Sequence, residues 1–259
     1  MGPDMSSILH LRFLGVGNAA AHELGNAAAV LEDASGAPLL LIDCGPTVLP
    51  AFIARYGELP AALFVTHTHL DHVGGLENLF YRLACDATDL PPVRLYLPAD
   101  LVARLHQQLG EDLYKLAEGG VNFWDRFQLI PVGDHFWHAG YAFDVFAVDH
   151  HGYRTAFGLA LPGYFVYTGD TRPIPQQLAR FAAGGEPVFH DCSLRGNPSH
   201  TGADDLERCY STELRERLVL YHYESTLAAH QLKRLGYTVA APGSVFSLDP
   251  ARPGLRCVV

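Results

Sequence analysis

Lysine is nearly absent from this chain of 259 residues, which has only Lys115 and Lys233 among its 18 basic residues. The formal net charge is −10 at pH 7 and no basic run stands out, so long nucleic acid is not an expected partner. No apolar run is long enough to cross a bilayer, and the amino terminus lacks a secretion signal. The 5 cysteines show no paired spacing, which indicates reduced thiols. We therefore expect a cytoplasmic protein with no membrane partner.

Histidine, in contrast, is abundant, and three histidines with one carboxylate lie within the segment Thr66–His72. This segment follows an apolar run at 61–65 that predicts a buried strand and precedes a predicted helix start at 73–76. If the strand geometry continues, His67 and His69 project from the same side, and Asp71 and His72 face a second position. Such a cluster is typical of metal ligands and disfavours the alternative of a polar loop with incidental histidines.

The chain alternates between short strand patterns and helix patterns without a linker, a charge block or a repeat. Strands are predicted at residues 9–14, 27–31, 39–43, 61–65, 93–97, 128–132, 142–148, 156–161, 164–168, 187–191, 218–223 and 237–241. Helices are predicted at residues 47–56, 100–109, 112–118, 175–181, 203–211 and 226–235. This order favours two mixed sheets that face each other with helices outside, in a single domain over residues 1–259.

Three later strands also end in residues that can bind metal. One ends at His150 and His151, one is followed by Asp170 after a glycine, and one is followed by His222. Singly, such residues are more often ordinary surface or core residues, and Asp170 could cap the following helix. In order behind the first segment, they could complete a site for two metals.

At this point the chain resembles the metallo-β-lactamase-fold hydrolases, and within them the ribonuclease Z-like branch. The resemblance lies in the His67–His72 cluster and in several motifs along most of the chain: Phe13–Gly17, Asn26, Leu41–Gly45, Gly169–Thr171, His190–Ser193, Ser199–Thr201 and Leu220–His222. It implies an α/β fold, the four-layer αβ/βα sandwich, with metals at the mouth between the sheets. It also suggests a homodimer.

The resemblance assigns the metal ligands position by position. His67, His69 and His150 would hold one cation, Asp71, His72 and His222 the other, and Asp170 would bridge both. His151 competes with His150, which we prefer because it stands directly at the strand end. The two divalent ions would be zinc, although manganese or iron also suits this donor set. Asp43 and Thr68 are candidates for orienting the ligating rings, against the alternative that they are ordinary strand-end polar residues.

The chain departs from the tRNA-processing members of this branch. They carry a long arm before the Gly-Asp-Thr motif, whereas the segment from His150 to Asp170 is filled by two predicted strands. Asp191 stands where the family has glutamate, and Glu224 stands where it has arginine, which removes a cation suited to phosphate. These departures argue against tRNA and leave the predicted metal chemistry unchanged.

The resulting hypothesis is a dinuclear metal-dependent phosphodiesterase that acts on a small phosphodiester, either cyclic or linear. A hydroxide bridging the metals would attack phosphorus, Asp71 would orient that water, and His200, which matches the family's acid, would protonate the leaving oxygen. His200 could instead be a simple loop residue. The alternatives are a lactone or thioester hydrolase of the same fold and a non-enzymatic metal-binding accessory protein of a biosynthetic pathway. Some of the surplus histidines, such as His151 and His190, could hold an additional cation with Asp191 and His200.

Overall fold

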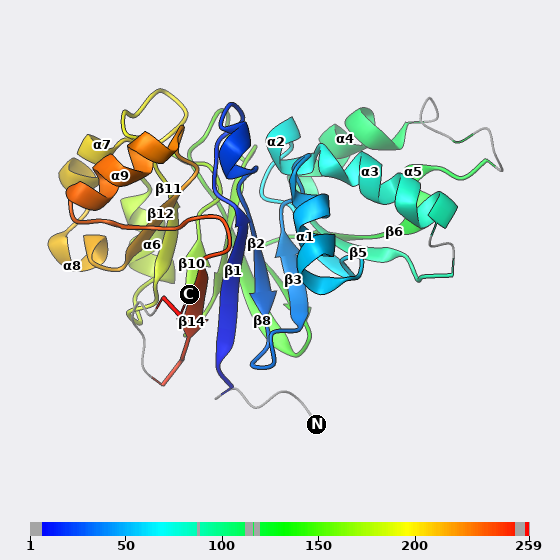
Figure 1. Ribbon diagram of the computed structural model, residues 1–259, viewed down its shortest axis with the longest axis horizontal. Coiled ribbons are helices and arrows are strands. Elements are labelled where there is room, and N and C mark those ends of the chain that lie inside the picture. Colours follow the sequence, from blue (N-terminus) through cyan, green and yellow to red (C-terminus); the bar gives the residue numbers. More distant parts are fainter. Residues whose placement is uncertain (1–6, 87–88, 112–115, 117–119, 252–256, 259) are drawn as a thin grey trace.

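The computed structural model describes residues 7–86, 89–111, 116, 120–251 and 257–258, which form two facing β-sheets with helices outside (Figure 1). The first sheet has the order β14-β1-β2-β3-β4-β5-β6. Its strands are β1 (Leu9–Gly15), β2 (Ala28–Glu32), β3 (Pro38–Ile42), β4 (Ala62–Phe64), β5 (Val93–Pro98), β6 (Phe127–Val132) and β14 (Val245–Leu248). The predicted αβ/βα sandwich is confirmed, and the single domain stays a prediction.

The second sheet has the order β13-β12-β11-β10-β9-β8-β7. Its strands are β7 (His135–His138), β8 (Tyr141–Ala147), β9 (Phe157–Leu161), β10 (Phe165–Tyr167), β11 (Val188–Asp191), β12 (Leu218–Tyr221) and β13 (Thr238–Val239). Strands β3 to β6 pair in parallel in the first sheet, and β10 to β13 do so in the second. The carboxyl ends of parallel neighbours meet at one edge of a sheet, which is where ligands bind in α/β folds.

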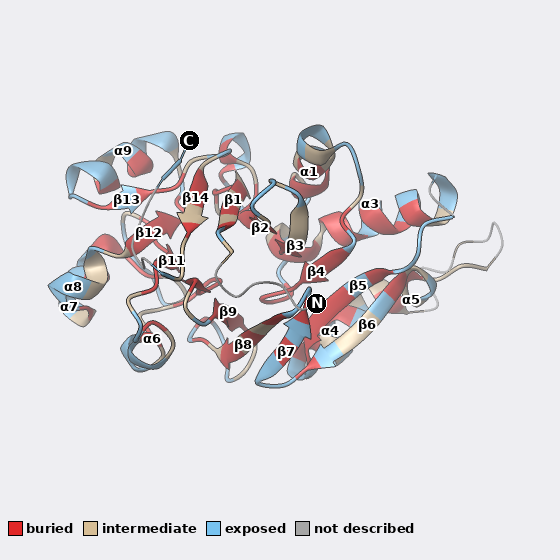
Figure 2. Ribbon diagram, turned by 90° about the horizontal axis from the view of Figure 1, so that it is seen from below, coloured by how far each residue is buried: buried red, intermediate tan, exposed pale blue. Residues whose placement is uncertain are grey.

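Helices cover the outer side of each sheet, and they are half buried while the strands between them are mostly buried (Figure 2). On the side of the first sheet lie α1 (Val48–Tyr56), α2 (Leu70–Val73), α3 (Gly75–Tyr81), α4 (Val102–Leu105) and α5 (Phe123–Arg126). On the side of the second lie α6 (Pro175–Phe181), α7 (Ala203–Cys209), α8 (Thr212–Arg215) and α9 (Thr226–Arg234). Among the described residues, no helix combines the length and apolar character needed to cross a membrane.

Aromatic side chains from both sheets form the core between them. Phe13 of β1 is fully buried, and its ring centroid lies 5.5 Å from that of Tyr221 and 5.7 Å from that of Phe189 in the second sheet. Buried aromatic pairs of this kind contribute about 0.5–1.5 kcal/mol beyond their burial. The sheets are thereby fixed relative to each other directly below the edge where the parallel strands end.

Several predicted elements differ from the structure. The predicted helix 100–109 is divided into a short 3₁₀ turn at Ala99–Leu101, α4 and a π turn at His106–Gly110, and the predicted helix 112–118 lies almost entirely outside the described residues. The sequence pattern missed β7 because this strand exposes an apolar residue and buries a polar one. Trp137 is 66% exposed, whereas His138 is buried. His138 is tolerated there because its Nε2 contacts Leu39 O at 2.8 Å and its Nδ1 contacts the Tyr96 hydroxyl at 3.0 Å.

The strand preceding the histidine segment also ends earlier than expected. β4 stops at Phe64, so the sequence spacing of His67 and His69 does not come from strand alternation. The two rings nevertheless meet, with centroids 4.6 Å apart, in a loop that follows the strand and leads into α2. The expected proximity is therefore right, and of the expected strand geometry only an isolated bridge from His67 to Ala156 and an extended His69 remain beyond Phe64.

Candidate metal centre

Seven ligand-type side chains meet at the edge where the parallel strands end. We call them the donor cluster: His67, His69, Asp71, His72, His150, Asp170 and His222. They form two groups in which the ligand atoms lie within 4.8 Å of one another, the first with His67, His69 and His150 and the second with the other four residues. All seven ligands assigned by the resemblance are thus brought together, in the grouping that was expected.

The first group consists only of imidazoles. His150 Nε2 lies 3.3 Å from His69 Nδ1, and the centroids of His67 and His150 are 5.0 Å apart. Burial lowers the pKa of His67 and lowers the pKa of His150 to about 4, so both rings are neutral near pH 7. A neutral imidazole is the form that binds a metal.

Asp170 lies between the two groups. Its Oδ2 is 3.7 Å from His67 Nε2, 3.3 Å from His72 Nε2 and 3.2 Å from His222 Nε2. Asp71 Oδ2 is 3.5 Å from His72 Nε2 and 3.6 Å from His222 Nε2. Although burial opposes it, the neighbouring rings of His222 and His72 hold the pKa of Asp71 below its usual range. Both carboxylates are therefore ionised beside the rings.

The donor cluster fits divalent cations. His67 Nε2, His72 Nε2, His222 Nε2 and Asp170 Oδ1 are buried and have no hydrogen-bond partner among the described residues. Buried polar atoms without partners are costly unless something else binds them. Against the effect of burial, the charges of Asp170 and Asp191 raise the pKa of His222 to about 10, so a positive charge is favoured here. Imidazole and carboxylate donors without a thiolate suit zinc, manganese or iron.

A second layer of contacts orients the ligands. Asp43 is fully buried, and its Oδ2 lies 2.8 Å from His72 Nδ1 and accepts a 2.7 Å hydrogen bond from the Thr66 hydroxyl. Thr66 Oγ1 also lies 3.1 Å from His67 Nδ1. Asp43 makes the contact with a candidate ligand that was expected of it. Thr66 makes the contact that was expected of Thr68, whose backbone carbonyl instead accepts a 3.0 Å bond from Gln108.

The structure distinguishes His150 from His151. His150 is buried, and its Nδ1 lies 2.8 Å from the Ser199 carbonyl oxygen, which leaves Nε2 facing His69. His151 is exposed, and its Nδ1 contacts the Ser199 hydroxyl at 3.2 Å. The geometry favours His150 as the ligand, and a backbone carbonyl on Nδ1 is a usual way to orient such a ring.

A cavity of about 230 Å³ opens beside the donor cluster. Its lining consists of four members of the donor cluster and of Asn18, Ala19, Ala20, Ser193, Asn197 and His200. His200 Nδ1 lies 2.8 Å from Asp191 Oδ2, so the aspartate spans the distance despite being one methylene shorter than glutamate. Asp191 also accepts a 2.9 Å bond from Thr171 N and lies 3.4 Å from His222 Nδ1.

Two further sequence features have structural explanations. His190 is not part of the donor cluster, because its Nδ1 contacts Asp191 O and its Nε2 contacts the Tyr210 hydroxyl, each at 2.7 Å. His190 is therefore not available as a ligand for the additional cation that the surplus histidines suggested. Glu224 accepts a 3.3 Å bond from Leu194 N, so it supports the loop beside the cavity.

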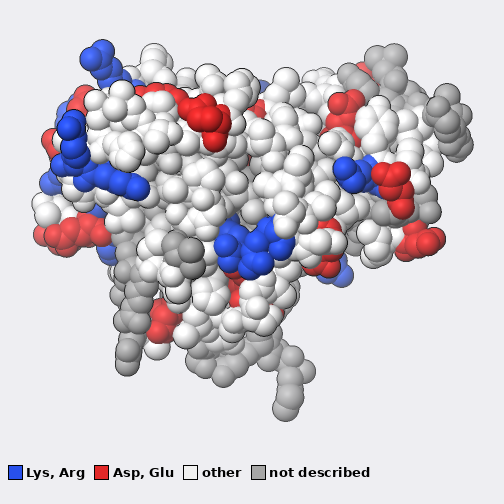
Figure 3. All heavy atoms as spheres, in the orientation of Figure 1, with Lys and Arg blue, Asp and Glu red and all other residues white. Residues whose placement is uncertain are grey.

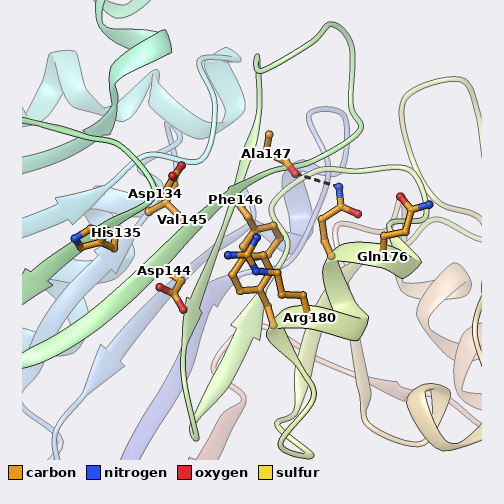
Figure 4. Close-up of a pocket in the computed structure, with 10 residues that line it drawn as sticks. Asp134, His135, Asp144, Val145, Phe146, Ala147, Gln176 and Arg180 are labelled. Atoms are coloured by element: carbon orange, nitrogen blue, oxygen red, sulfur yellow. Dashed lines mark hydrogen bonds between the residues drawn. The ribbon is translucent and has the colours of Figure 1, made fainter.

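A larger groove of about 550 Å³ lies elsewhere, between the β7–β8 hairpin and α6. Figure 4 shows Arg180 and Gln176 on the α6 side and Asp134, His135 and Asp144 on the hairpin side. It shares no residue with the donor cluster. The smaller cavity is therefore the one that serves the candidate metal centre.

The fold and the donor cluster define a metal-dependent hydrolase of the metallo-β-lactamase fold. The metallo-β-lactamase-fold protein YhfI from Bacillus subtilis superposes with a TM-score of 0.71 at 16% identity, covering 93% of this chain and 99% of that protein. More particularly, the chain belongs to the family of the anti-Pycsar protein Apyc1, whose model matches residues 9–246.

Individual relatives agree with this assignment. The anti-Pycsar protein Apyc1 of Paenibacillus xerothermodurans is 29% identical over 230 residues, which cover 85% of this chain and 89% of that protein. The zinc phosphodiesterase ELAC protein 2 of Homo sapiens is 32% identical over 238 residues, which cover 77% of this chain but only 27% of that protein. These matches confirm the predicted hydrolase of the ribonuclease Z-like branch.

Proposed function

We propose that this protein is a dinuclear metal-dependent phosphodiesterase that hydrolyses a small cyclic phosphodiester, with cyclic nucleotides as the substrate class to test. The observation that carries the proposal is Asp170, whose Oδ2 lies 3.7, 3.3 and 3.2 Å from the Nε2 atoms of His67, His72 and His222, three buried nitrogens without a hydrogen-bond partner in the described part of the chain. Membership of the Apyc1 family and the similarity to a zinc phosphodiesterase support the choice of a phosphodiester.

The metal ligands in this proposal are His67, His69 and His150 for one cation, Asp71, His72 and His222 for the other, and Asp170 for both. Two divalent cations held there would activate a water and neutralise charge that develops on a phosphoryl oxygen. Zinc is our first choice of metal because the donors are imidazoles and carboxylates.

The remaining steps belong to side chains of the chain itself. The Asp71 carboxylate lines the cavity and remains ionised, so it can accept a hydrogen bond from the attacking water and orient it. His200 also lines the cavity. Because Asp191 holds its Nδ1, Nε2 is the nitrogen left to give a proton to the leaving oxygen.

The substrate is small for three structural reasons. The cavity of about 230 Å³ is below the ~300–1,000 Å³ of typical small-molecule pockets. The segment from His150 to Asp170 contains only a loop, β9 and β10, with no inserted arm. Lys and Arg on the face shown in Figure 3 form small separate groups beside acidic ones, and the net charge of −10 disfavours a long polyanion.

The test is an assay of metal-loaded protein against cyclic mononucleotides, linear dinucleotides, a structured RNA, lactones and thioesters, with products separated by chromatography. We expect ring opening of cyclic phosphodiesters and no cleavage of the RNA. An Asp170→Asn variant, which loses the shared carboxylate charge, serves as the inactive control. Activity confined to lactones or thioesters, or no hydrolysis by protein shown to hold both metals, would overturn the proposal.

A further inference from the structure

The loop between β8 and β9, which carries His150, contains an unusual backbone conformation. Four non-glycine residues of the described chain have positive φ: Asp43 (63°), Ala139 (50°), Arg154 (54°) and His222 (66°). Asp43 and His222 belong to the metal centre and its support, and Ala139 precedes Gly140 in the tight turn between β7 and β8. The positive φ of Arg154 is not explained by the metal centre or by this turn. Strained residues of this kind persist only when surrounding contacts stabilise them.

Arg154 occupies a turn position that normally belongs to glycine. Thr155 N donates to Gly152 O at 3.3 Å, so Arg154 is the third residue of a tight turn. A positive φ at that position is typical of a type II turn, which favours glycine or asparagine there. The Thr155 hydroxyl accepts a 3.1 Å bond from Gly152 N, but this contact does not involve Arg154.

Asp100 holds the arginine in place. Arg154 Nε donates to Asp100 Oδ1 at 3.1 Å, and Nη2 donates to Asp100 Oδ2 at 2.8 Å. Such two-point pairing fixes the orientation of a guanidinium as well as its position. Asp100 lies in the 3₁₀ turn Ala99–Leu101 directly after β5, so the pair ties the loop of the second sheet to the first sheet.

The other supports of this loop lie at its ends and at the rings of His150 and His151, the latter through the Ser199 hydroxyl. Val148 N donates to Ala156 O at 3.1 Å and closes the base of the loop. Asp149 N donates to the Thr171 hydroxyl at 3.2 Å, and His150 Nδ1 contacts Ser199 O. The Arg154–Asp100 pair supports the tip, four residues after the candidate ligand.

We propose that Arg154 and Asp100 are positioning residues: their pair holds the left-handed turn that keeps His150 in place for the first metal. This inference rests on the metal centre of the proposed function but not on the identity of the substrate. The second metal group has no ligand in this loop, so it should be insensitive to the pair.

The experiment compares metal binding by three variants, Arg154→Ala, Arg154→Gly and Asp100→Ala, in competition with a chelating dye for Zn²⁺. In Arg154→Ala and Asp100→Ala we expect one of two binding steps to weaken about tenfold, the low end for residues that support a ligand, with the other step unchanged. Arg154→Gly should bind nearly as the wild type does, because glycine adopts the turn without needing the pair.

Ala139→Gly is the matched control, because it relieves the same backbone conformation at the opposite end of β8 and should change neither step. Thermal unfolding in chelator establishes that each variant is folded. Wild-type binding by Arg154→Ala and Asp100→Ala, equal weakening of both steps, or Arg154→Gly as weak as Arg154→Ala would each overturn the inference. A wild type that binds two ions without hydrolysing any phosphodiester, with one step still sensitive to Arg154→Ala, would refute the proposed function alone.

Discussion

The buried pair of Asp43 and His72 provides a direct test of how the metal centre is held. Asp43 accepts hydrogen bonds from Thr66 N at 2.8 Å and from the Thr66 hydroxyl, and its Oδ2 faces His72 Nδ1. As a carboxylate it can only accept, so His72 carries its proton on Nδ1 and leaves Nε2 free for a metal. In Asp43→Asn, the amide can donate to Nδ1 and would favour the tautomer with the proton on Nε2.

The expected cost can be worked out from these contacts. Asparagine keeps partners for Thr66 and tolerates positive φ, so Asp43→Asn should fold. Its metal affinity should fall about 10–100-fold in the His72 step, which is roughly 1.4–2.8 kcal/mol. Asp43→Ala instead leaves two buried groups, Thr66 N and His72 Nδ1, without their partner at about 1–3 kcal/mol each and adds about 1–2 kcal/mol of backbone strain. That sum, roughly 3–8 kcal/mol, is comparable with the ~5–15 kcal/mol that stabilises a whole domain.

The assay is metal competition on Asp43→Asn, with Asp204→Asn as a control at an exposed aspartate whose side chain is 75% accessible. Thermal unfolding of both variants and of Asp43→Ala in chelator measures the cost to the fold. If Asp43→Asn retained both wild-type binding steps, the assignment of the His72 tautomer and the role of Asp43 would be refuted.

Three other predictions follow from the same geometry. His150→Ala should lose one metal-binding step while His151→Ala keeps both, because only His150 is buried among the other rings; metal stoichiometry by elemental analysis decides between them. His200→Asn should lower kcat about 10²–10⁴-fold with both metals retained, and an unchanged kcat would exclude His200 as the acid. Removing metal with chelator should lower the Tm. Adding back Zn²⁺ at ~100 times its Kd should restore about 2.7 kcal/mol for each ion bound, since the ions bind the folded state, and an unchanged Tm would contradict an ordered site.

The sequence predicted the donor cluster well because its first four members lie within the six residues His67–His72, and because Asp170 and His222 follow parallel strands. Such strands end at the same edge, so Asp170 and His222 could be placed near His67 without knowing the loops. The choice between His150 and His151 could not be made this way, because the contact that separates them is the backbone carbonyl of Ser199, which any residue would supply. The contacts of Thr66 were missed because they also depend on loop geometry. β4 ends at Phe64, two residues before Thr66, and in the loop that follows the Thr66 hydroxyl donates to Asp43.

Strand β7 could not be predicted from the sequence because its buried and exposed positions do not match the polarity of its residues. β7 exposes a tryptophan and buries a histidine, which reverses the pattern that identifies strands. The predicted homodimer and the cytoplasmic location depend on surfaces and signals that the fold of one chain does not test, and they stay predictions.

The segment 193–200 limits where substrate preference can change. It lines the cavity through Ser193, Asn197 and His200, and its Ser199 carbonyl holds the ring of His150. A mutation that reshapes this segment for a new substrate would therefore also disturb a ligand. Asn18, Ala19 and Ala20 line the same cavity, and the backbone of this segment is also tied to a ligand, because His222 N donates to Val16 O and Asn18 N donates to Tyr223 O. A change of specificity that leaves the chemistry intact is therefore best sought in the side chains of Ala19 and Ala20, which are not members of the donor cluster.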